Sequence, residues 1–204
     1  LEKQYEKILR VTEHNPVIVF DLRKDAVFHD GHPFDSGDVL FTYNSIVNAK
    51  GTSPRKSDYE PVKLATVLGS HKIKFTYKRL FSPAFGSWSM GILPEHLLNE
   101  KKLQEEAKKR GRDPENFIMR DSNFGRHPVG TGAFKFVEWK SDEFIRLRHN
   151  EDYWEGAPEY EEYVMRIIPD ALTQEMEFYA GAIDNYSVQP HQVARFTQEN
   201  KFQS

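Results

Sequence analysis

Apolar and polar residues alternate most clearly near the start of a stretch that reads VIVFDLRKDAVFHDGHPFDSGDVLFTY, residues 17–43. Ile18, Phe20 and Leu22 recur at a period of two, with charged or β-branched residues between them. Residues at this period point to the same face of a strand. The pattern therefore predicts a half-buried strand at the head of the stretch.

A tight turn and a capped helix are predicted to follow this strand. The turn at residues 29–33 contains Gly31, which tolerates positive φ, and a proline. Asp35 is placed to cap a helix, and Asp38 at the third helical position completes a capping box. The residues expected on the buried face of that helix are Val39, Leu40, Tyr43, Ile46 and Val47. Gly51 is the expected C-terminal stop.

Two pairs of strands joined by short turns are predicted further along the chain. The pairs are residues 62–68 with 72–77, and 133–139 with 143–149. A nearly continuous apolar run at residues 163–168 is typical of a strand covered on both faces. A further extended segment is expected to restart at Ile183 and Asp184.

Helical patterns and loops occupy the rest of the chain. The predicted helices are a short or frayed segment at 1–10, two short helices within 81–98, a charged surface helix at 101–110, one from Asp170 to Gly181, and a last one within 191–200. Residues 52–61 and 111–129 read as polar loops, and the second is the expected domain boundary. This order of strands and helices indicates a mixed α/β architecture.

Composition and charge exclude several classes of function. The chain has 28 Lys and Arg against 31 Asp and Glu, a net charge of −3, which gives no argument for nucleic acid or an acidic membrane surface. It contains no cysteine, so disulfides, thiolate metal sites and a cysteine nucleophile are excluded. No run of residues approaches the length of about 18 apolar positions that a membrane span requires.

Three segments, taken in order, resemble the family 5 extracellular solute-binding proteins, the oligopeptide-, dipeptide- and nickel-binding receptors of ABC importers. They are residues 17–43, PVGTGAFKFVEW at 128–139 and RHNEDYWEG at 148–156. The resemblance covers nearly the whole chain. It implies a periplasmic-binding-protein type II-like fold, with residues 1–128 forming a smaller extra domain and 129–204 forming part of the first ligand-binding lobe. Family members are about twice as long or more and carry a signal peptide, so both ends are interpreted as cut, the chain as about half of a mature receptor, and the second lobe as absent.

The resemblance also implies a function. Such a receptor captures a small solute between two lobes outside the membrane and delivers it to the membrane subunits of an ABC importer. The expected location is periplasmic or extracellular, with a lipid anchor as one option for the full-length protein, and the expected state is a monomer. Peptide leads among the ligands as the commonest class in the family, and oligosaccharides and metal complexes remain alternatives.

Site candidates come from the same resemblance and from aromatic content. The segment Gly181-Ala182-Ile183-Asp184 matches a Gly-Glu-Ile-Asp segment of the family, and the positions just after it approach the cleft there. The resulting ligand-binding candidates are Asn185, Tyr186 and Ser187. Trp88, in the aromatic segment 81–88, either lines a ligand groove or packs in the core, and Tyr59 is a weaker candidate. The Tyr153-Trp154 pair is interpreted as part of a structural corner.

Other chemistry finds little support in the sequence. Gly130-Thr131-Gly132 precedes a predicted strand, whereas a phosphate-binding loop of the Walker type opens a helix, so a crossing turn is the preferred interpretation. The eight histidines show no ligand spacing, and no hydrolase motif is present. We therefore expect no cofactor, no metal and no catalytic residues. Two alternatives stay open: a receptor-fold module that binds a membrane signalling protein, and a hydrolase that uses a distant carboxylate pair.

Overall fold

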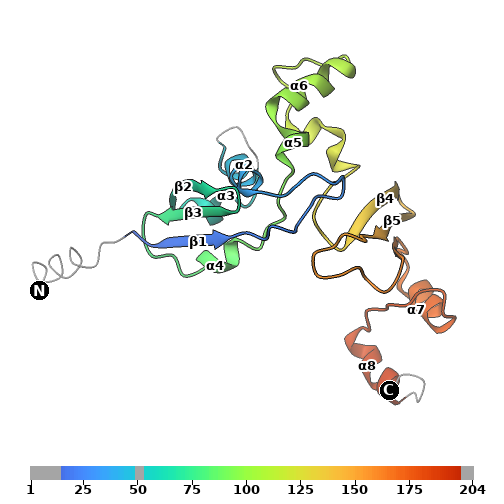
Figure 1. Cartoon of the computed structure of the whole chain (residues 1–204). Coiled ribbons are helices and arrows are strands. Elements are labelled where there is room, and N and C mark those ends of the chain that lie inside the picture. Colours follow the sequence, from blue (N-terminus) through green and yellow to red (C-terminus); the bar gives the residue numbers. More distant parts are fainter. Residues whose placement is uncertain (1–14, 49–52, 199–204) are drawn as a thin grey trace, which may run out of the picture. The chain divides into compact units, whose positions relative to one another are not determined.

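Figure 1 shows the computed structural model, which describes residues 15–48 and 53–198. The chain forms two compact units. The first unit runs through Glu138 and also takes Arg146–Tyr163, and the second consists of Trp139–Ile145 and the chain from Val164 onward. The helix predicted within residues 1–10 and the stop predicted at Gly51 lie outside the described residues.

The first sheet has three antiparallel strands in the order β1-β3-β2 (Figure 1). They are β1 Val17–Asp21, β2 Val62–Gly69 and β3 Lys72–Tyr77. The register pairs Ile18 with Phe75 and Phe20 with Ile73, so the alternating apolar residues of neighbouring strands share a face. The predicted first strand and the predicted hairpin are both confirmed.

An apolar core forms on that face of the sheet. Its fully buried centre is made by Ile73 and Phe75 of β3, both 0% exposed. Helix α2, Ser36–Val47, lays Val39 and Tyr43 against the sheet. The remaining buried members are Tyr59, Val62 and Tyr77. The predicted apolar face of the 36–47 helix is therefore confirmed.

The N-terminus of α2 carries the predicted capping box. The Asp35 carboxylate accepts the backbone N–H of Gly37 at 2.6 Å, and Asp38 Oδ2 accepts the backbone N–H of Asp35 at 3.0 Å. Asp38 is 4% exposed, and its Oδ1 also accepts the backbone N–H of Glu95 at 2.9 Å. Because Glu95 opens α5, Glu95–Leu98, one carboxylate joins the starts of two helices.

Short helical segments complete the first unit. They are α3 Lys56–Tyr59, α4 Ala84–Ser87, α6 Glu100–Lys109, and the 3-10 turns Met119–Asp121 and Asn123–Gly125. The two short helices predicted within 81–98 and the charged helix near 101–110 are confirmed. The loops predicted at 52–61 and 111–129 are wrong in part, because α3 and the two 3-10 turns lie inside them. Tyr59 and Phe117 are buried there, which fixes these segments against their neighbours.

The second sheet has the order β4-β5-β6. Its strands are β4 Phe134–Lys140, β5 Phe144–His149 and β6 Glu162–Arg166. The predicted hairpin is confirmed, and Asp142 in its turn has a positive φ of 62°. The prediction that the third strand is covered on both faces is wrong for the described residues, because every residue of β6 is exposed. An apolar run alone does not reveal whether another layer lies over it.

Two helices follow the second sheet. Helix α7 spans Ala171–Tyr179, and a 3-10 turn at Pro190–Gln192 leads into α8, Val193–Gln198. Ile183 and Asp184 belong to no strand, so the extended segment predicted there did not form one. Together the sheets and helices make a mixed α/β protein, as the order of elements predicted.

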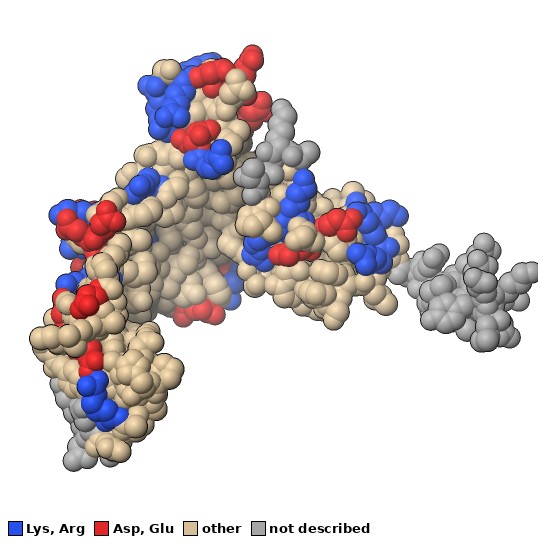
Figure 2. Space-filling model, turned by 180° about the vertical axis from the view of Figure 1, so that it is seen from behind, with Lys and Arg blue, Asp and Glu red and all other residues tan. Residues whose placement is uncertain are grey.

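Charged residues of both signs are mixed on the face of the molecule that Figure 2 shows. On the face shown in Figure 2, basic and acidic residues lie close to one another, with uncharged surface between the groups. No helix within residues 15–48 and 53–198 is long and apolar enough to cross a membrane.

Candidate ligand-binding segment

The segment predicted to approach ligand, residues 185–187, is positioned by the end of α7. Asp170 caps this helix by accepting the backbone N–H of Thr173 at 2.6 Å and its hydroxyl at 2.7 Å. The hydrogen bond from the Thr173 hydroxyl has the largest effect, and together with the backbone hydrogen bond it holds the pKa of Asp170 below its ordinary value. At the other end Gly181 adopts a φ of +73°, and the N–H of Ala182 returns to Glu177 O at 2.8 Å. The chain therefore leaves the helix in a defined direction.

The three candidate residues of this segment differ in exposure. Asn185 and Ser187 are exposed, whereas Tyr186 between them is half-buried. The carboxamide of Asn185 and the hydroxyl of Ser187 are neutral hydrogen-bonding groups. A ligand that reached this segment would meet donors and acceptors without formal charge.

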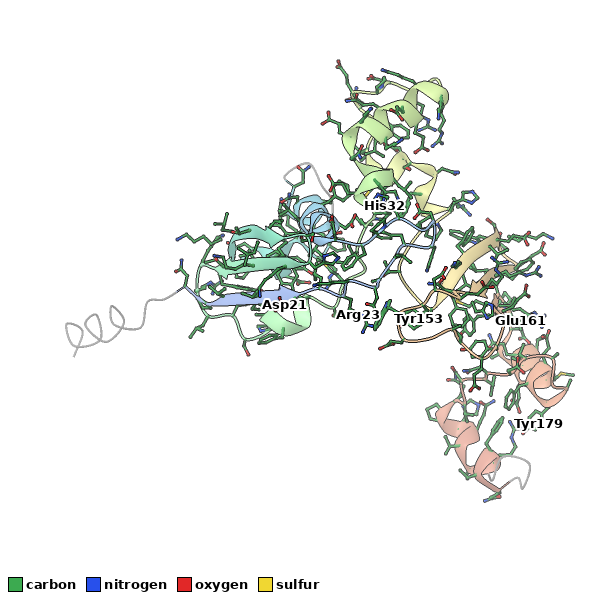
Figure 3. All side chains as sticks on the ribbon, viewed as in Figure 1. Asp21, Arg23, His32, Tyr153, Glu161 and Tyr179 are labelled. Atoms are coloured by element: carbon green, nitrogen blue, oxygen red, sulfur yellow. The ribbon has the colours of Figure 1, made fainter. Side chains whose placement is uncertain are left out.

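Tyr186 is held from both its hydroxyl and its ring. The hydroxyl donates to Gln192 Oε1 at 2.9 Å. The ring lies 5.6 Å from that of Phe178 and 5.7 Å from that of Phe196, each at an interplanar angle of 25°. Tyr179, labelled in Figure 3, adds a ring 5.5 Å from Phe196. The result is a four-ring cluster, which contains the buried Phe196, at 7% exposed.

Gln192 connects this tyrosine to a buried carboxylate. Its Nε2 donates to Glu175 Oε2 at 2.6 Å, and its Oε1 accepts the backbone N–H of Gln189 at 2.9 Å. Glu175 is 8% exposed and forms an ion pair with Arg195. A buried carboxylate requires such partners, because leaving it unpaired would be costly.

The two candidates in the first unit, Tyr59 and Trp88, lie in its aromatic core. Tyr59 is 1% exposed, and its hydroxyl donates to Ser87 O and contacts Met90 Sδ at 3.0 Å. Trp88 is partly buried, with its ring 3.9 Å from that of Phe75. Its Nε1 donates to the hydroxyl of Tyr77 at 2.9 Å. Burial raises the pKa of Tyr59, as expected for a phenol removed from water.

The Tyr153-Trp154 motif forms a corner that Arg23 holds. The Arg23 guanidinium lies 4.5 Å from the centre of the Trp154 ring and donates to Trp154 O at 3.2 Å. It also binds both carboxylate oxygens of Asp25, at 3.0 and 2.7 Å, which lowers the pKa of that carboxyl. Figure 3 shows Arg23 and Tyr153 close together. This geometry fits the structural interpretation of the motif.

The Gly130-Thr131-Gly132 turn is held by His29, a residue of the turn that follows β1. His29 Nδ1 accepts the N–H of Gly130 at 3.2 Å, and His29 Nε2 lies 2.9 Å from Gly132 O. The backbone N–H of His29 also donates to Gly130 O at 2.8 Å. Partial burial lowers the pKa of His29, which favours the neutral ring that these two contacts require. A strand follows the turn, as the sequence predicted.

A second histidine cluster contains His32 and His96. His96 Nε2 is 2.7 Å from Asp30 Oδ2, and the His96 ring stacks on that of His32 at 3.8 Å. Partial burial opposes ionisation of Asp30, but hydrogen bonds from His96 and from the His32 backbone outweigh it and lower its pKa. Across residues 15–48 and 53–198, no group of three or more His, Cys, Asp or Glu side chains is arranged to hold a metal ion.

Sequence reasoning missed Glu175, Gln192 and His29 as residues that organise these segments. Glu175 is a charged residue in the middle of α7, and Gln192 lies two residues after Pro190 in a polar region. Glu175 and Gln192 are 17 positions apart, and His29 is 101 positions from Gly130. Only the folded chain brings these partners together.

The two sheets and their helices make a mixed α/β protein, and comparison with known proteins identifies its family. Residues 6–204 match the profile of the bacterial extracellular solute-binding proteins, family 5 Middle. The chain belongs to this family.

Several relatives are similar to the chain. It is 30% identical over 172 residues to the oligopeptide-binding protein AppA of Bacillus subtilis, covering 82% of this chain and 29% of that protein. The structure of AppA in complex with a nonapeptide superimposes with a TM-score of 0.76 at 27% identity, over 93% of this chain and 36% of AppA. NikZ of Campylobacter jejuni, solved in complex with Ni(L-His), gives a TM-score of 0.77 at 26% identity, over 93% of this chain and 35% of NikZ. The chain thus spans about a third of its relatives' length, a smaller share than the half expected from the sequence.

Proposed function

We propose that this chain is part of an extracellular or periplasmic receptor that captures a peptide and delivers it to an ABC importer. The observation that carries the proposal is membership of the family 5 solute-binding proteins over residues 6–204. Peptide is the preferred ligand because the relative that is 30% identical is named an oligopeptide-binding protein. Other similar proteins are the heme-binding protein A of Haemophilus influenzae and NikZ, which was solved with a nickel–histidine complex, so heme and metal complexes are the ligands to test against peptide.

In the proposed mechanism, two lobes close on the ligand about a hinge, and the membrane subunits of the importer select the closed form. No covalent step is needed. Residues 1–128 would form the smaller extra domain and 129–204 part of the first lobe, with a second lobe supplied by the rest of the parent protein. The receptor would act as a monomer, with or without a lipid anchor.

Within the chain, we place the ligand-binding segment at Asn185, Tyr186 and Ser187. The first and last of these are exposed, as a ligand contact requires. Trp88 and Tyr59, which the sequence also suggested, are given a packing role in this proposal because their side chains contribute to the aromatic core.

The first experiment is native mass spectrometry of the full-length parent, purified without denaturation, with identification of whatever dissociates. A mixture of short peptides is the expected result. A single sugar, heme or metal complex would overturn the peptide assignment but keep the receptor function. A protein that is empty and ignores all of these ligands would overturn the receptor function in favour of a module that binds a membrane protein.

A second experiment uses calorimetry on the 204-residue chain and the full-length parent with the same peptide. Because ligand is proposed to lie between two lobes, the 204-residue chain alone should bind far more weakly than the parent. Micromolar or tighter binding by the 204-residue chain would contradict the two-lobed mechanism.

A further inference from the structure

The side chain of Tyr186 is already engaged within the protein, whereas those of its two neighbours are exposed. Its hydroxyl proton is given to Gln192 Oε1 at 2.9 Å, and its ring stacks with those of Phe178 and Phe196. Asn185 and Ser187 are exposed instead. The tyrosine therefore anchors the segment, while its neighbours present their polar groups to solvent.

The orientation of the Gln192 amide is set by the carboxylate it meets. A carboxylate only accepts hydrogen bonds, so the Gln192 atom 2.6 Å from Glu175 Oε2 must be the donating Nε2. Its Oε1 is then the acceptor for both the Tyr186 hydroxyl and the Gln189 N–H. Glu175 thus determines which way the amide points, and the amide in turn holds Tyr186.

The same turn holds the segment from its C-terminal side. Gln189 Nε2 donates to Ser187 O at 3.2 Å. The backbone N–H of Gln189 donates to Gln192 Oε1 at 2.9 Å, and the backbone N–H of Gln192 donates to Gln189 O at 2.8 Å, which closes the 3-10 turn at Pro190–Gln192. Two hydrogen bonds therefore hold the segment, one from Tyr186 to Gln192 and one from Gln189 to Ser187. Both involve residues at or beside this turn.

We propose that Gln192, oriented by Glu175, is a positioning residue that fixes Tyr186 and so presents Asn185 and Ser187 to the ligand. This inference rests on the proposed receptor function. The complementary part of the ligand is a neutral hydrogen-bonding group, since an amide and a hydroxyl are what the segment offers.

The experiment compares Q192E with Q198E in the full-length parent. Both variants replace a glutamine by a glutamate in the same region, but Gln198 is exposed at the end of α8. In Q192E two carboxylates meet and the donor to Glu175 is lost. Hydrogen exchange of the free protein at amides 185–189 should speed up about tenfold in Q192E and stay unchanged in Q198E.

The donor swap E175Q/Q192E provides a rescue. The amide would then stand at position 175 and donate to a carboxylate at position 192, which still accepts from Tyr186 and Gln189. The hydrogen bond between positions 175 and 192 is restored with its direction reversed, whereas the ion pair of Glu175 with Arg195 is lost. The swap should therefore recover part of the exchange protection that Q192E loses. Y186F, which removes only the hydroxyl and keeps the ring contacts, should show a smaller rise than Q192E.

Affinity is measured on the same variants with a nonapeptide as the probe. Q192E should weaken binding about tenfold, with recovery in the swap and no change in Q198E. Equal exchange in Q192E and Q198E, or no recovery in the swap, would overturn the positioning role. A wild-type parent that binds no peptide while the exchange results hold would overturn the peptide function and leave the positioning of the segment intact.

Discussion

The two compact units of this chain bury their apolar side chains to very different degrees. In the first unit Ile73 and Phe75 are 0% exposed, at the centre of a core that a sheet and helices enclose. In the second, Leu172 and Met176 on α7 are 65% and 64% exposed, although they recur at helical spacing. Single exposed apolar residues are ordinary, but a group of them marks a surface that contacts something else.

The second unit is therefore held together by other interactions than the apolar core of the first unit. Its buried residues include two polar side chains, Glu175 and Gln192, which are hydrogen-bonded to each other. Phe196 and its aromatic neighbours supply the apolar part. A small buried polar network fixes geometry strongly while adding less stability than an apolar core of the same size. We therefore expect the first unit to be the more stable of the two.

The largest expected effect is on the core of the first unit. Phe75→Ala should lower the free energy of unfolding by about 3–5 kcal/mol, because it removes a fully buried ring and leaves a cavity. Phe85→Ala is the matched control, since Phe85 is 78% exposed on α4, and it should change stability by less than about 0.5 kcal/mol. Urea unfolding followed by tryptophan fluorescence measures both. Equal losses for the two variants would mean that the core is not where the structure places it.

The next effect concerns the exposed face of α7. Met176→Ala should change the unfolding free energy of the 204-residue chain by less than about 0.5 kcal/mol, because the side chain is largely in water. In the full-length parent the same substitution should cost about 2 kcal/mol if this face is covered there. Chemical denaturation of both proteins makes the comparison. A negligible cost in the parent as well would show that the second unit keeps its apolar face open.

A smaller effect is expected at the shared helix cap. Asp38→Ala should cost about 1–2 kcal/mol, because it leaves the backbone N–H groups of Asp35 and Glu95 without their acceptor. Asp58→Ala removes an exposed carboxylate whose contact with Arg55 is 3.4 Å, and it should cost less than about 0.5 kcal/mol. Thermal unfolding by circular dichroism distinguishes them, and similar melting temperatures would argue against a joining role for Asp38.

The smallest effect depends on pH. The pKa of His29 is lowered in the folded protein, so the unfolded chain binds its proton more readily. The stabilisation is complete above the unfolded pKa of about 6.5 and is lost as pH falls through the lower folded value. When the pH is lowered from 7.5 to 5.5, the free energy of unfolding should fall further in the wild type than in His29→Ala. The difference between the two proteins should be at most about 1 kcal/mol. Parallel pH profiles for the wild type and His29→Ala would contradict the role of His29.

Local patterns in the sequence were sufficient for several elements. The capping box of Asp35 and Asp38 depends on residues three positions apart, and the 62–77 hairpin depends on alternation and a short turn. The segments that resembled the family were found in the same way, and the family assignment followed. The exposure of β6 was not foreseen, because an apolar strand looks the same in sequence whether or not a layer covers it.

The sequence by itself determined the order of the main strands and helices, the capping box of Asp35 and Asp38, the family and the choice of the candidate segment at 185–187. Those features depend on spacing within a few residues, or on motifs that can be read along the chain. The tertiary structure decided that Tyr59 and Trp88 join the core and that Gln192 links Tyr186 to Glu175. It also decided that His29 holds Gly130 across 101 positions. These contacts join residues far apart in the sequence, so they exist only once packing has brought the segments together.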